Sequence, residues 1–493
     1  MAIITEAKLI KVLQAYNPWW RNPEAICPLS KPHKRIAYHE AVKILKHPTI
    51  RRFAVLSGAR RVGKTTILYQ IIENLIGEGV PAKNILYISF DNPIVKMVSA
   101  DDILGTYETL YPIDGDKYLF FDEVQYSENW ELWMKVFYDL RPDIKLVATG
   151  SASPILEKGA SDSGTGRWNI LKVPTLSFYE YCELLELENR PKIHDSLRPT
   201  ELCRLPKGEL AELMDKFAPM QQHFNRYLTI GGFPELVLSG DDTYAQRVLR
   251  EDVVDKVIKR DVLTLFNVRN PISMEKLFLY LCMTSSEIFN KQTVAKELEN
   301  IGISTVEDYV SFLEKSNLIY ISNPVMVGKK AALKGKPKIY VADAAIRSAV
   351  LMLDDVLSDD DEMGIMVETT VYKHIVSFYQ GASCAHIGYY RKAKENQKEV
   401  DIVIELPREK ILCEVKYKND SSVPASDAII ALSKEEDTNV TSSFIISKSL
   451  TDYGTAQHDT LIPVFRVPAV VFVYLLGKAE ATGEKSNSVY HIE

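Results

Sequence analysis

A glycine-rich segment placed directly after an apolar run limits the folds open to this chain more than any other feature. Residues 58–65 read Gly-Ala-Arg-Arg-Val-Gly-Lys-Thr, and they join the strand-like run 53–57 to a helical segment. The pattern G-x-x-x-x-G-K-[ST] in a strand-to-helix setting is typical of loops whose backbone amides surround phosphate groups. We therefore predict a nucleotide site at this point of a parallel α/β sheet. The alternative is a glycine turn that happens to contain a lysine.

The residues of this segment have distinct expected roles. Its glycines let the backbone curl around the phosphates, and the helix that follows adds the positive end of its dipole. Lys64 is expected to reach the β- and γ-phosphates, and the Thr65 hydroxyl is expected to ligate Mg²⁺. The predicted nucleotide-binding residues are Gly58, Ala59, Arg60, Arg61, Val62, Gly63, Lys64, Thr65 and Thr66.

Further apolar runs indicate the sheet around this loop. They lie at residues 85–90, 118–121, 145–148 and 171–173, and helical segments separate them. Strands that are apolar on both faces are typical of a parallel sheet covered by helices. The sequence therefore predicts an α/β core over residues 51–180.

Two adjacent acids follow the second of these runs. The residues Tyr-Leu-Phe-Phe-Asp-Glu at 118–123 resemble a Walker B element. In such an element Asp122 would hold Mg²⁺, and Glu123 would polarise the attacking water as general base. The next run ends at Thr149, whose hydroxyl at the carboxyl edge of the sheet can sense the γ-phosphate. Without the lysine-bearing loop, an ordinary polar strand end would be the simpler interpretation.

The composition indicates folded domains of ordinary kind. Of 493 residues, 46% are apolar and 25% are charged, which suits globular domains with sizeable cores. The net charge of -7 gives no general support for nucleic-acid binding, so such contact needs a local basic patch. The six cysteines form no C-x-x-C pair, and neither a signal-peptide pattern nor a bilayer-spanning run is evident. We expect reduced thiols, no membrane insertion and a cytoplasmic protein.

The middle of the chain divides by pattern. After the core the sequence turns helical and charged, which we interpret as a helical extension of that core. Two short helices, a strand and a lysine-rich hairpin then follow in the order of a winged helix-turn-helix. Six acids among residues 353–362 read as a solvated linker. The expected parts are a lead segment (1–50), the core (51–180), the extension (181–265), the winged helix (266–342), the linker (343–362), a last domain (363–480) and a tail (481–493).

The charge of the predicted winged helix gives two opposing indications about DNA. Three basic and six acidic residues lie between Glu287 and Tyr320, so its helices would be repelled by phosphate. The hairpin after Gly328 carries lysines alone, which would add salt-dependent affinity for a phosphate backbone. A solvated hairpin or a subunit contact would explain them equally. The lysines proposed to contact DNA are Lys329, Lys330, Lys334, Lys336 and Lys338.

A second group of charged residues lies near the C-terminus. Residues 399–405 and 411–416 read as a β-hairpin, and a loop of even length would place Asp401, Glu414 and Lys416 on one face. This is the D-x(n)-E-x-K arrangement of PD-(D/E)XK nucleases, in which two carboxylates bind Mg²⁺ and the lysine positions or activates water. The alternative is an amphipathic hairpin in which Lys416 merely pairs with an acid.

Together with Gly166-Arg167 and residues 176–180, these motifs make nearly the whole chain resemble a prokaryotic branch of AAA-type ATPases. Members of that branch carry a C-terminal domain of unknown function related to PD-(D/E)XK nucleases. The resemblance implies an α/β fold: a P-loop NTPase parallel sheet with helical extension, a winged helix-turn-helix and a C-terminal restriction-endonuclease-like α/β domain. It also implies ATP as the nucleotide and Glu368 as a further metal-binding acid. Arg167 would be an arginine finger or sensor, acting in cis or from a neighbouring subunit of a homo-oligomer.

The sequence thus predicts a Mg²⁺-dependent ATPase whose C-terminal half binds, and as a nuclease would cleave, DNA. The rival interpretation is a nucleotide-switched regulatory ATPase with an inactive nuclease-like domain and no DNA substrate, because Val400 stands where the nuclease motif has proline. The residues 231–234, Gly-Gly-Phe-Pro, fit the family but predict no chemistry. The predicted catalytic residues are Lys64, Glu123, Thr149, Arg167, Asp401, Glu414 and Lys416, and the predicted metal ligands are Thr65, Asp122, Glu368, Asp401 and Glu414.

Overall fold

The computed structural model divides the chain into two compact units. The first consists of Met1–Pro174 with Lys315–Asn317, and the second of Thr175–Glu314 with Leu318–Glu493. The structure describes residues 6–150, 166–262, 268, 270–298, 301–325, 335–353, 355–379, 385–392 and 399–482.

The first unit is built on a five-stranded parallel sheet. Its strand order is β2-β3-β4-β1-β5, and every neighbouring pair is parallel. All five predicted strands are present, although the last begins earlier than the sequence suggested. The strands are β1 (Phe53–Ser57), β2 (Ile85–Ser89), β3 (Lys117–Asp122), β4 (Ile144–Gly150) and β5 (Trp168–Lys172).

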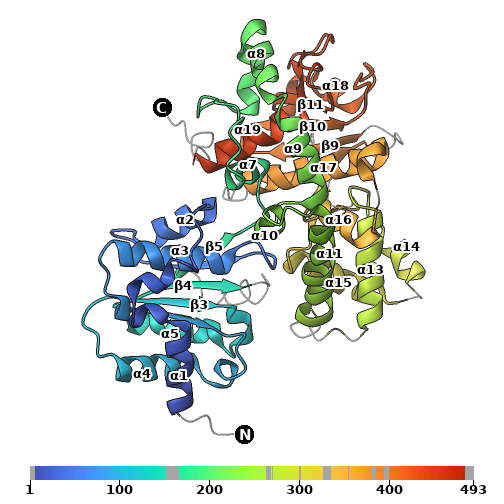
Figure 1. Ribbon diagram of the computed structural model, residues 1–493. Helices are drawn as coiled ribbons and strands as arrows, with labels where there is room; N and C mark the ends of the chain where they lie inside the picture. The colour runs from blue at the N-terminus through green and yellow to red at the C-terminus, as the bar shows by residue number, and fades with distance from the viewer. Residues whose placement is uncertain are drawn as a thin grey trace. The chain divides into compact units, whose positions relative to one another are not determined.

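Helices cover both faces of this sheet, which explains why its central strands are apolar throughout. Figure 1 shows α2 and α3 on one side of the sheet and α4 and α5 on the other. The expected lead segment belongs to the same unit, since the indole N–H groups of Trp19 and Trp20 both donate to the carbonyl of Ile85. The helices are α1 (Glu6–Tyr16), α2 (Ile36–Leu45), α3 (Lys64–Gly77), α4 (Ala100–Leu110) and α5 (Trp130–Leu140).

The expected helical extension, residues 181–265, belongs largely to the second unit and not to the core. Its described part is helical, as predicted. The helices of this unit are α7 (Phe178–Leu184), α8 (Lys207–Phe217), α9 (Met220–Ile230), α10 (Pro234–Val237), α11 (Asp242–Val248), the π-helices η7 (Leu249–Asp255) and η8 (Val257–Val262), α13 (Pro271–Met283), α14 (Lys291–Glu297), α15 (Ile303–Lys315), α16 (Ala344–Leu351), α17 (Asp360–Tyr379), α18 (Ala428–Leu432) and α19 (Ala469–Ala481).

The second unit contains one mixed sheet of eight strands, in the order β12-β13-β11-β10-β9-β8-β6-β7. Helices α14 and α15 and strand β6 lie where the sequence predicted two helices and a strand, while most of the predicted hairpin lies outside the described residues; β6 pairs with β8 and so joins the C-terminal sheet. Strands β6 and β7 thus belong to the same sheet as strands β8 to β13, and no domain boundary separates them. The strands are β6 (Ile319–Pro324), β7 (Lys338–Val341), β8 (His386–Arg391), β9 (Glu399–Glu405), β10 (Lys410–Lys416), β11 (Val440–Ser447), β12 (Gly454–Thr455) and β13 (Val464–Pro468).

The expected acidic linker at 343–362 is structured. It contains α16 and the first turn of α17. Three acids lie in that first turn, where the positive end of the helix dipole stabilises their negative charges. Glu362 accepts two hydrogen bonds from Arg347, at 2.9 and 2.7 Å. The acids that indicated a solvated segment therefore start a helix and hold it against α16.

A buried ion pair lies at the centre of the second unit. The Lys373 ammonium donates to the Asp343 carboxylate at 2.9 Å, and both side chains are 3% exposed. The ammonium also donates to Thr175, Tyr227 and the carbonyl of Leu176. Although burial favours the neutral acid, Lys373 lowers the pKa of Asp343 below its ordinary value. The pair joins α17 to the N-terminus of α16 and to the segment that begins the unit.

This ion pair explains the glycines for which the sequence predicted no role. Gly231 has a φ of +76°, and a β-carbon there would lie 2.5 Å from a carboxylate oxygen of Asp343. The Gly232 amide donates to Asp343 at 3.2 Å, and its carbonyl accepts from the Leu176 amide at 2.7 Å. Only residues without a side chain allow the backbone this close to the carboxylate and to Leu176.

Among the described helices, none is both long enough and apolar enough to cross a membrane. The apolar run at residues 467–477 extends into α19, whose residues are almost all buried within the second unit. It packs against α7 and α17. Its hydrophobic character is therefore explained by core packing.

Candidate functional site

The glycine-rich loop connects β1 to α3 as predicted. Gly63 lies just before the helix with a φ of +93°, and Arg61 has a φ of +62°, so the loop contains two left-handed residues close together. Glycine tolerates this conformation without steric cost. A β-carbon on Gly58 would lie 2.3 Å from the carbonyl oxygen of Val173, so the first glycine is required by close packing.

Two basic side chains hold the ends of this loop. The Lys64 ammonium is buried and donates to the carbonyls of Gly58 and Ala59, at 2.8 and 2.9 Å. Arg35 donates to the carbonyls of Val62 and Pro174, at 2.8 and 2.9 Å. Arg35 could not be singled out from the sequence, because it precedes α2 and contacts the loop only through the tertiary fold.

The Asp122 carboxylate lies at the centre of a hydrogen-bond network beside the loop. It accepts from the hydroxyl of Thr65 at 2.8 Å, from that of Tyr87 at 2.9 Å, and from that of Thr149. Burial and the negative charge of Asp122 raise the pKa of Tyr87 far above its ordinary value, so this hydroxyl remains a donor. Two predicted residues, Thr65 of α3 and Thr149 of β4, therefore meet at the carboxylate of the predicted Asp122, which ends β3.

Glu123 follows Asp122 in a left-handed conformation, with a φ of +54°. Its amide donates to the Thr149 hydroxyl at 3.1 Å, and its carboxylate accepts from the side-chain amide of Gln125. Burial raises the pKa of Glu123, and the positive charge of Lys64 opposes that shift. A buried carboxylate with a raised pKa is a stronger proton acceptor than an exposed one, which suits a general base.

The chemistry of these donors fits a nucleotide with Mg²⁺. Asp122 and Thr65 supply hard oxygen atoms of the kind that Mg²⁺ prefers, and few of them, as in sites where phosphates and water complete the shell. Lys64 places a buried positive charge at the start of α3, where the helix dipole also favours an anion.

Arg167 lies away from these residues. It immediately precedes β5, whose first residue is opposite Phe53 at the start of β1, whereas the loop follows the end of that strand. Five residues of strand separate the two edges, a distance of about 16 Å. The guanidinium instead pairs with Asp139 of α5 at 2.8 and 3.0 Å. The expectation of a role in cis is therefore not supported, while a role toward a neighbouring subunit stays a prediction.

The hairpin of β9 and β10 has the predicted register. Ile404 is opposite Ile411 and Val403 is opposite Leu412, which places Asp401 and Glu414 on one face. The Asp401 amide donates to Glu414 at 3.3 Å, and Lys416 donates to Glu414 at 2.6 Å. Burial, and then the charge of Asp401, raise the pKa of Glu414 well above its ordinary value.

Glu368 of α17 lies near the same face, as the resemblance implied. Its carboxylate accepts from the Tyr340 hydroxyl at 2.8 Å. Burial and the charge of Asp401 raise the pKa of Glu368 to about 7, against the effect of Lys338. The four predicted residues and Glu399 form one group, which we call the carboxylate cluster: Glu368, Glu399, Asp401, Glu414 and Lys416.

Lys338 corrects one prediction about DNA. The sequence placed it on an exposed wing, but its side chain is 4% exposed and its ammonium lies among the carboxylates. It is 3.5 Å from Glu368, 3.5 Å from Asp401, and paired with Glu399. Lys336 is exposed, and the other three predicted lysines lie outside the described residues.

As arranged, the carboxylate cluster does not fit a divalent ion. In the part of the chain that the structure describes, no three His, Cys, Asp or Glu side chains are gathered so as to hold a metal. The cation among Glu368, Glu399 and Asp401 is the Lys338 ammonium. The nucleotide site and the carboxylate cluster therefore differ in how readily a metal would enter.

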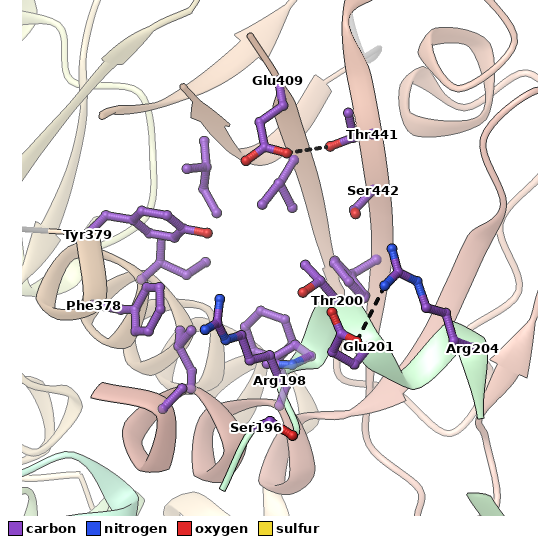
Figure 2. A pocket seen from close by; sticks show the side chains of 18 residues that line it. Ser196, Arg198, Thr200, Glu201, Arg204, Phe378, Tyr379, Glu409, Thr441 and Ser442 are labelled. Atoms are coloured by element: carbon purple, nitrogen blue, oxygen red, sulfur yellow. Dashed lines mark hydrogen bonds and ion pairs between the residues drawn. The ribbon is translucent and has the colours of Figure 1, made fainter. Parts of the chain in front are cut away.

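A cavity of about 630 Å³ lies elsewhere in the second unit. Figure 2 shows Glu409 paired with Thr441 at one part of its wall and Glu201 paired with Arg204 at another. Its wall includes Ile404 and Ile411, which belong to the apolar face of the hairpin, opposite Asp401. The cavity is thus distinct from the carboxylate cluster.

Three family models match parts of the chain. Residues 51–182 match a family described as an AAA domain. Residues 221–357 and 363–467 match two domains of unknown function, DUF8612 and DUF4143. The first match covers the loop, the acidic pair, Thr149 and Arg167, which supports an AAA-type ATPase domain. The matches in the second unit assign no activity.

Three curated proteins that are similar to the chain carry names that state no function. One from Haemophilus influenzae is 24% identical over 59% of this chain and 68% of its own length. Two from Methanocaldococcus jannaschii are each 25% identical: MJ1544 over 59% of this chain and 60% of its length, and MJ1637 over 82% and 84%. The chain therefore spans less than two thirds of one of these relatives.

Solved structures show only distant likeness. The Aeropyrum pernix ORC1 protein in complex with DNA has a TM-score of 0.30 at 13% identity, covering 68% of this chain and 96% of that one. The A. pernix ORC2 protein, in ADPNP and ADP complexes, has a TM-score of 0.34 at 14% identity, covering 66% and 95%. The Hsp104:casein complex of S. cerevisiae has a TM-score of 0.29 at 16% identity, covering 63% and 60%. At such scores these likenesses carry no statement about activity.

Proposed function

Since residues 51–182 match the AAA domain family, we propose that this protein is a Mg²⁺-dependent ATP hydrolase. The observation that carries the proposal is the convergence of Thr65 and Thr149 on the Asp122 carboxylate, beside a loop that ends in the buried Lys64. These residues come from α3 and two adjacent strands. The fold therefore places close together the groups that phosphate transfer requires.

The residues of the site have separate roles in this proposal. The loop amides and Lys64 bind the phosphates, and Lys64 exchanges its two loop carbonyls for phosphate oxygens. Asp122 and Thr65 would hold Mg²⁺, which would offset the negative charge that develops on the phosphate oxygens. Glu123 orients the attacking water and accepts its proton, and Thr149 holds the Glu123 backbone in place through the 3.1 Å hydrogen bond.

Replacing Glu123 by Gln is the direct test of the general base. We expect ATP binding to persist, because the phosphate-binding groups are unchanged, while the turnover number falls about 10²- to 10⁴-fold. Phosphate release and equilibrium binding of a fluorescent ATP analogue measure the two effects. Glu128→Gln, at an exposed position five residues along, is the matched control and should behave as wild type. Equal turnover in Glu123→Gln and wild type would remove Glu123 from the mechanism.

The carboxylate cluster favours a second candidate function, the hydrolysis of DNA phosphodiester bonds. What supports it is that Asp401 and Glu414 share one face, with Lys416 paired to Glu414 at 2.6 Å, and that Glu368 and Asp401 both contact the Lys338 ammonium. Carboxylates of this kind can bind a divalent ion and place water against a phosphodiester, but here the Lys338 ammonium would first have to leave Glu368 and Asp401. The rival interpretation is that this domain is an inactive nuclease-like module used in regulation. The position of Lys338 among the carboxylates supports that interpretation.

Asp401→Asn decides between the two. If the second candidate holds, wild type nicks supercoiled DNA in the presence of Mn²⁺ or Mg²⁺, and the variant falls to background because it loses a charge shared by the whole cluster. Gel assays across a matrix of metals and nucleotides measure nicking, with phosphate release followed in parallel. The variant should retain ATP hydrolysis. Nicking that is equal in both proteins would indicate a contaminant, and none in either would leave the regulatory module as the function.

A further inference from the structure

The carboxylate cluster has an internal cation that the nuclease-like pattern does not include. Lys338 begins β7, within the match to DUF8612 and outside the match to DUF4143 that contains Asp401, and its ammonium reaches acids of α17 and β9. It is far from Asp401 in sequence, at a separation of 63 residues. Its place in the cluster is therefore a product of the tertiary fold.

The charge of the cluster shows what this lysine does. Four acids lie there: Glu368, Glu399, Asp401 and Glu414. Two lysines accompany them, and each occupies a different part: Lys416 pairs with Glu414, and Lys338 lies among the other three acids. Hence the half of the cluster that Glu368 and Asp401 would offer to a metal already holds a covalently tethered cation.

The geometry shows that a metal and this ammonium would compete. The ammonium nitrogen is 3.5 Å from an oxygen of Glu368 and 3.5 Å from an oxygen of Asp401. A Mg²⁺ ion needs oxygen ligands at about 2.1 Å, so the carboxylates would have to close on the volume that the nitrogen occupies. A divalent ion and Lys338 cannot hold Glu368 and Asp401 together at the same time.

The surroundings hold Lys338 in this position. Its side chain is almost fully buried, it lies over the ring of Tyr389 at 5.5 Å, and Tyr340 of the same strand donates to Glu368. Leaving the cluster would therefore require β7 to shift or the side chain to turn out. This distinguishes Lys338 from the half-buried Lys416, whose side chain is 34% exposed.

We propose that Lys338 is a built-in competitor of the divalent cation, which keeps the carboxylate cluster free of metal until the lysine is displaced. The inference rests on the proposed use of Asp401 as a metal ligand. The ligand it concerns is a hard divalent cation such as Mn²⁺ or Mg²⁺. The lysine thereby sets the metal affinity of the cluster, independently of whether DNA is cleaved there.

Mn²⁺ binding to the full chain tests this directly. Mn²⁺ bound at the cluster is measured from the free-ion electron paramagnetic resonance signal, as the difference between each protein and the same protein carrying Asp401→Asn. We expect Lys338→Met to bind Mn²⁺ at the cluster at least tenfold more tightly than wild type, because a competing positive charge is gone. Lys338→Arg should stay weak. Lys336→Met, which removes an exposed lysine two residues away, should match wild type.

Thermal stability gives a second readout, since a ligand that binds only the folded state raises its melting temperature. Mn²⁺ should raise the melting temperature of Lys338→Met far more than that of wild type. If Lys338→Met does not fold, wild type alone still tests the idea. Acetylation of Lys338, followed by mass spectrometry, should accelerate as Mn²⁺ is added, while acetylation of Lys336 stays constant.

The outcomes separate this inference from the proposed functions. Equal Mn²⁺ affinity in Lys338→Met and wild type overturns the inference. If both proteins bind Mn²⁺ tightly, the metal site itself is still supported. If neither protein binds Mn²⁺, the second candidate function is rejected as well. Acetylation of Lys338 that does not respond to Mn²⁺ also overturns the inference. Tighter Mn²⁺ binding by Lys338→Met without any DNA nicking supports Lys338 as a competitor of the metal and rejects nuclease activity as a function. ATP hydrolysis is expected to be unaffected in every case.

Discussion

Lys64→Ala should abolish measurable ATP hydrolysis, with a loss of about 100-fold or more in the turnover number. Removing one preorganised donor to a developing negative charge costs this much in other enzymes, and Lys64 is the buried cation of the loop. Its ammonium donates to the carbonyls of Gly58 and Ala59, so the side chain already lies inside the curve of the loop. Phosphate release at saturating ATP measures the loss.

The control for this substitution is Lys11→Ala, which removes an exposed lysine from α1 in the same unit. It should hydrolyse ATP as wild type does. Circular dichroism should show that Lys64→Ala keeps its helical content, because the loop carbonyls that lose a donor can be hydrated. If Lys64→Ala hydrolyses ATP at the rate of Lys11→Ala, the assignment of the nucleotide site is wrong.

Lys373→Met should produce the largest loss of stability in the second unit, about 3–5 kcal/mol in the free energy of unfolding. Removing one partner of a buried ion pair leaves the other charge without compensation in a medium that solvates it poorly. Here the remaining charge would be Asp343, which is 3% exposed and also holds the Gly232 amide and the N-terminus of α16. Urea unfolding measures the difference from wild type.

An exposed ion pair on the same unit provides the comparison. Lys418 pairs with Asp361 at 3.2 Å, and the side chains are 62% and 87% exposed. Lys418→Met should change stability by no more than about 0.5 kcal/mol, because water screens such pairs. The double variant Lys373→Met with Asp343→Asn should be more stable than Lys373→Met alone. Equal losses in Lys373→Met and Lys418→Met would show that the buried pair does not organise the unit.

Local patterns were sufficient where the interacting residues are close in sequence. The loop could be predicted because its glycines, Lys64 and Thr65 are contiguous and lie between a strand and a helix. The hairpin register could be predicted because alternation along two short strands determines which side chains share a face. Asp401 and Glu414 lie as that alternation required.

Two of the errors share one cause, which is that charge alone does not reveal burial. Lysines near a hairpin indicated an exposed wing, yet Lys338 lies among acids that are distant in sequence. A run of acids indicated a solvated linker, yet Glu362 pairs with Arg347 within α16. A charged side chain remains exposed to water unless the folded structure places an oppositely charged group beside it. The spacing of residues along the sequence does not show which distant groups meet in this way.

The chain's own order of residues therefore determined the nucleotide loop, the acidic pair after β3 and the face of the C-terminal hairpin, since each depends on neighbours a few positions apart. Only the tertiary structure decided that Arg167 lies at the other edge of the sheet, that Lys373 and Asp343 form the buried pair, and that Lys338 occupies the carboxylate cluster. Those pairings form across separations of 30 to 63 residues, where packing and not local sequence determines which charges meet.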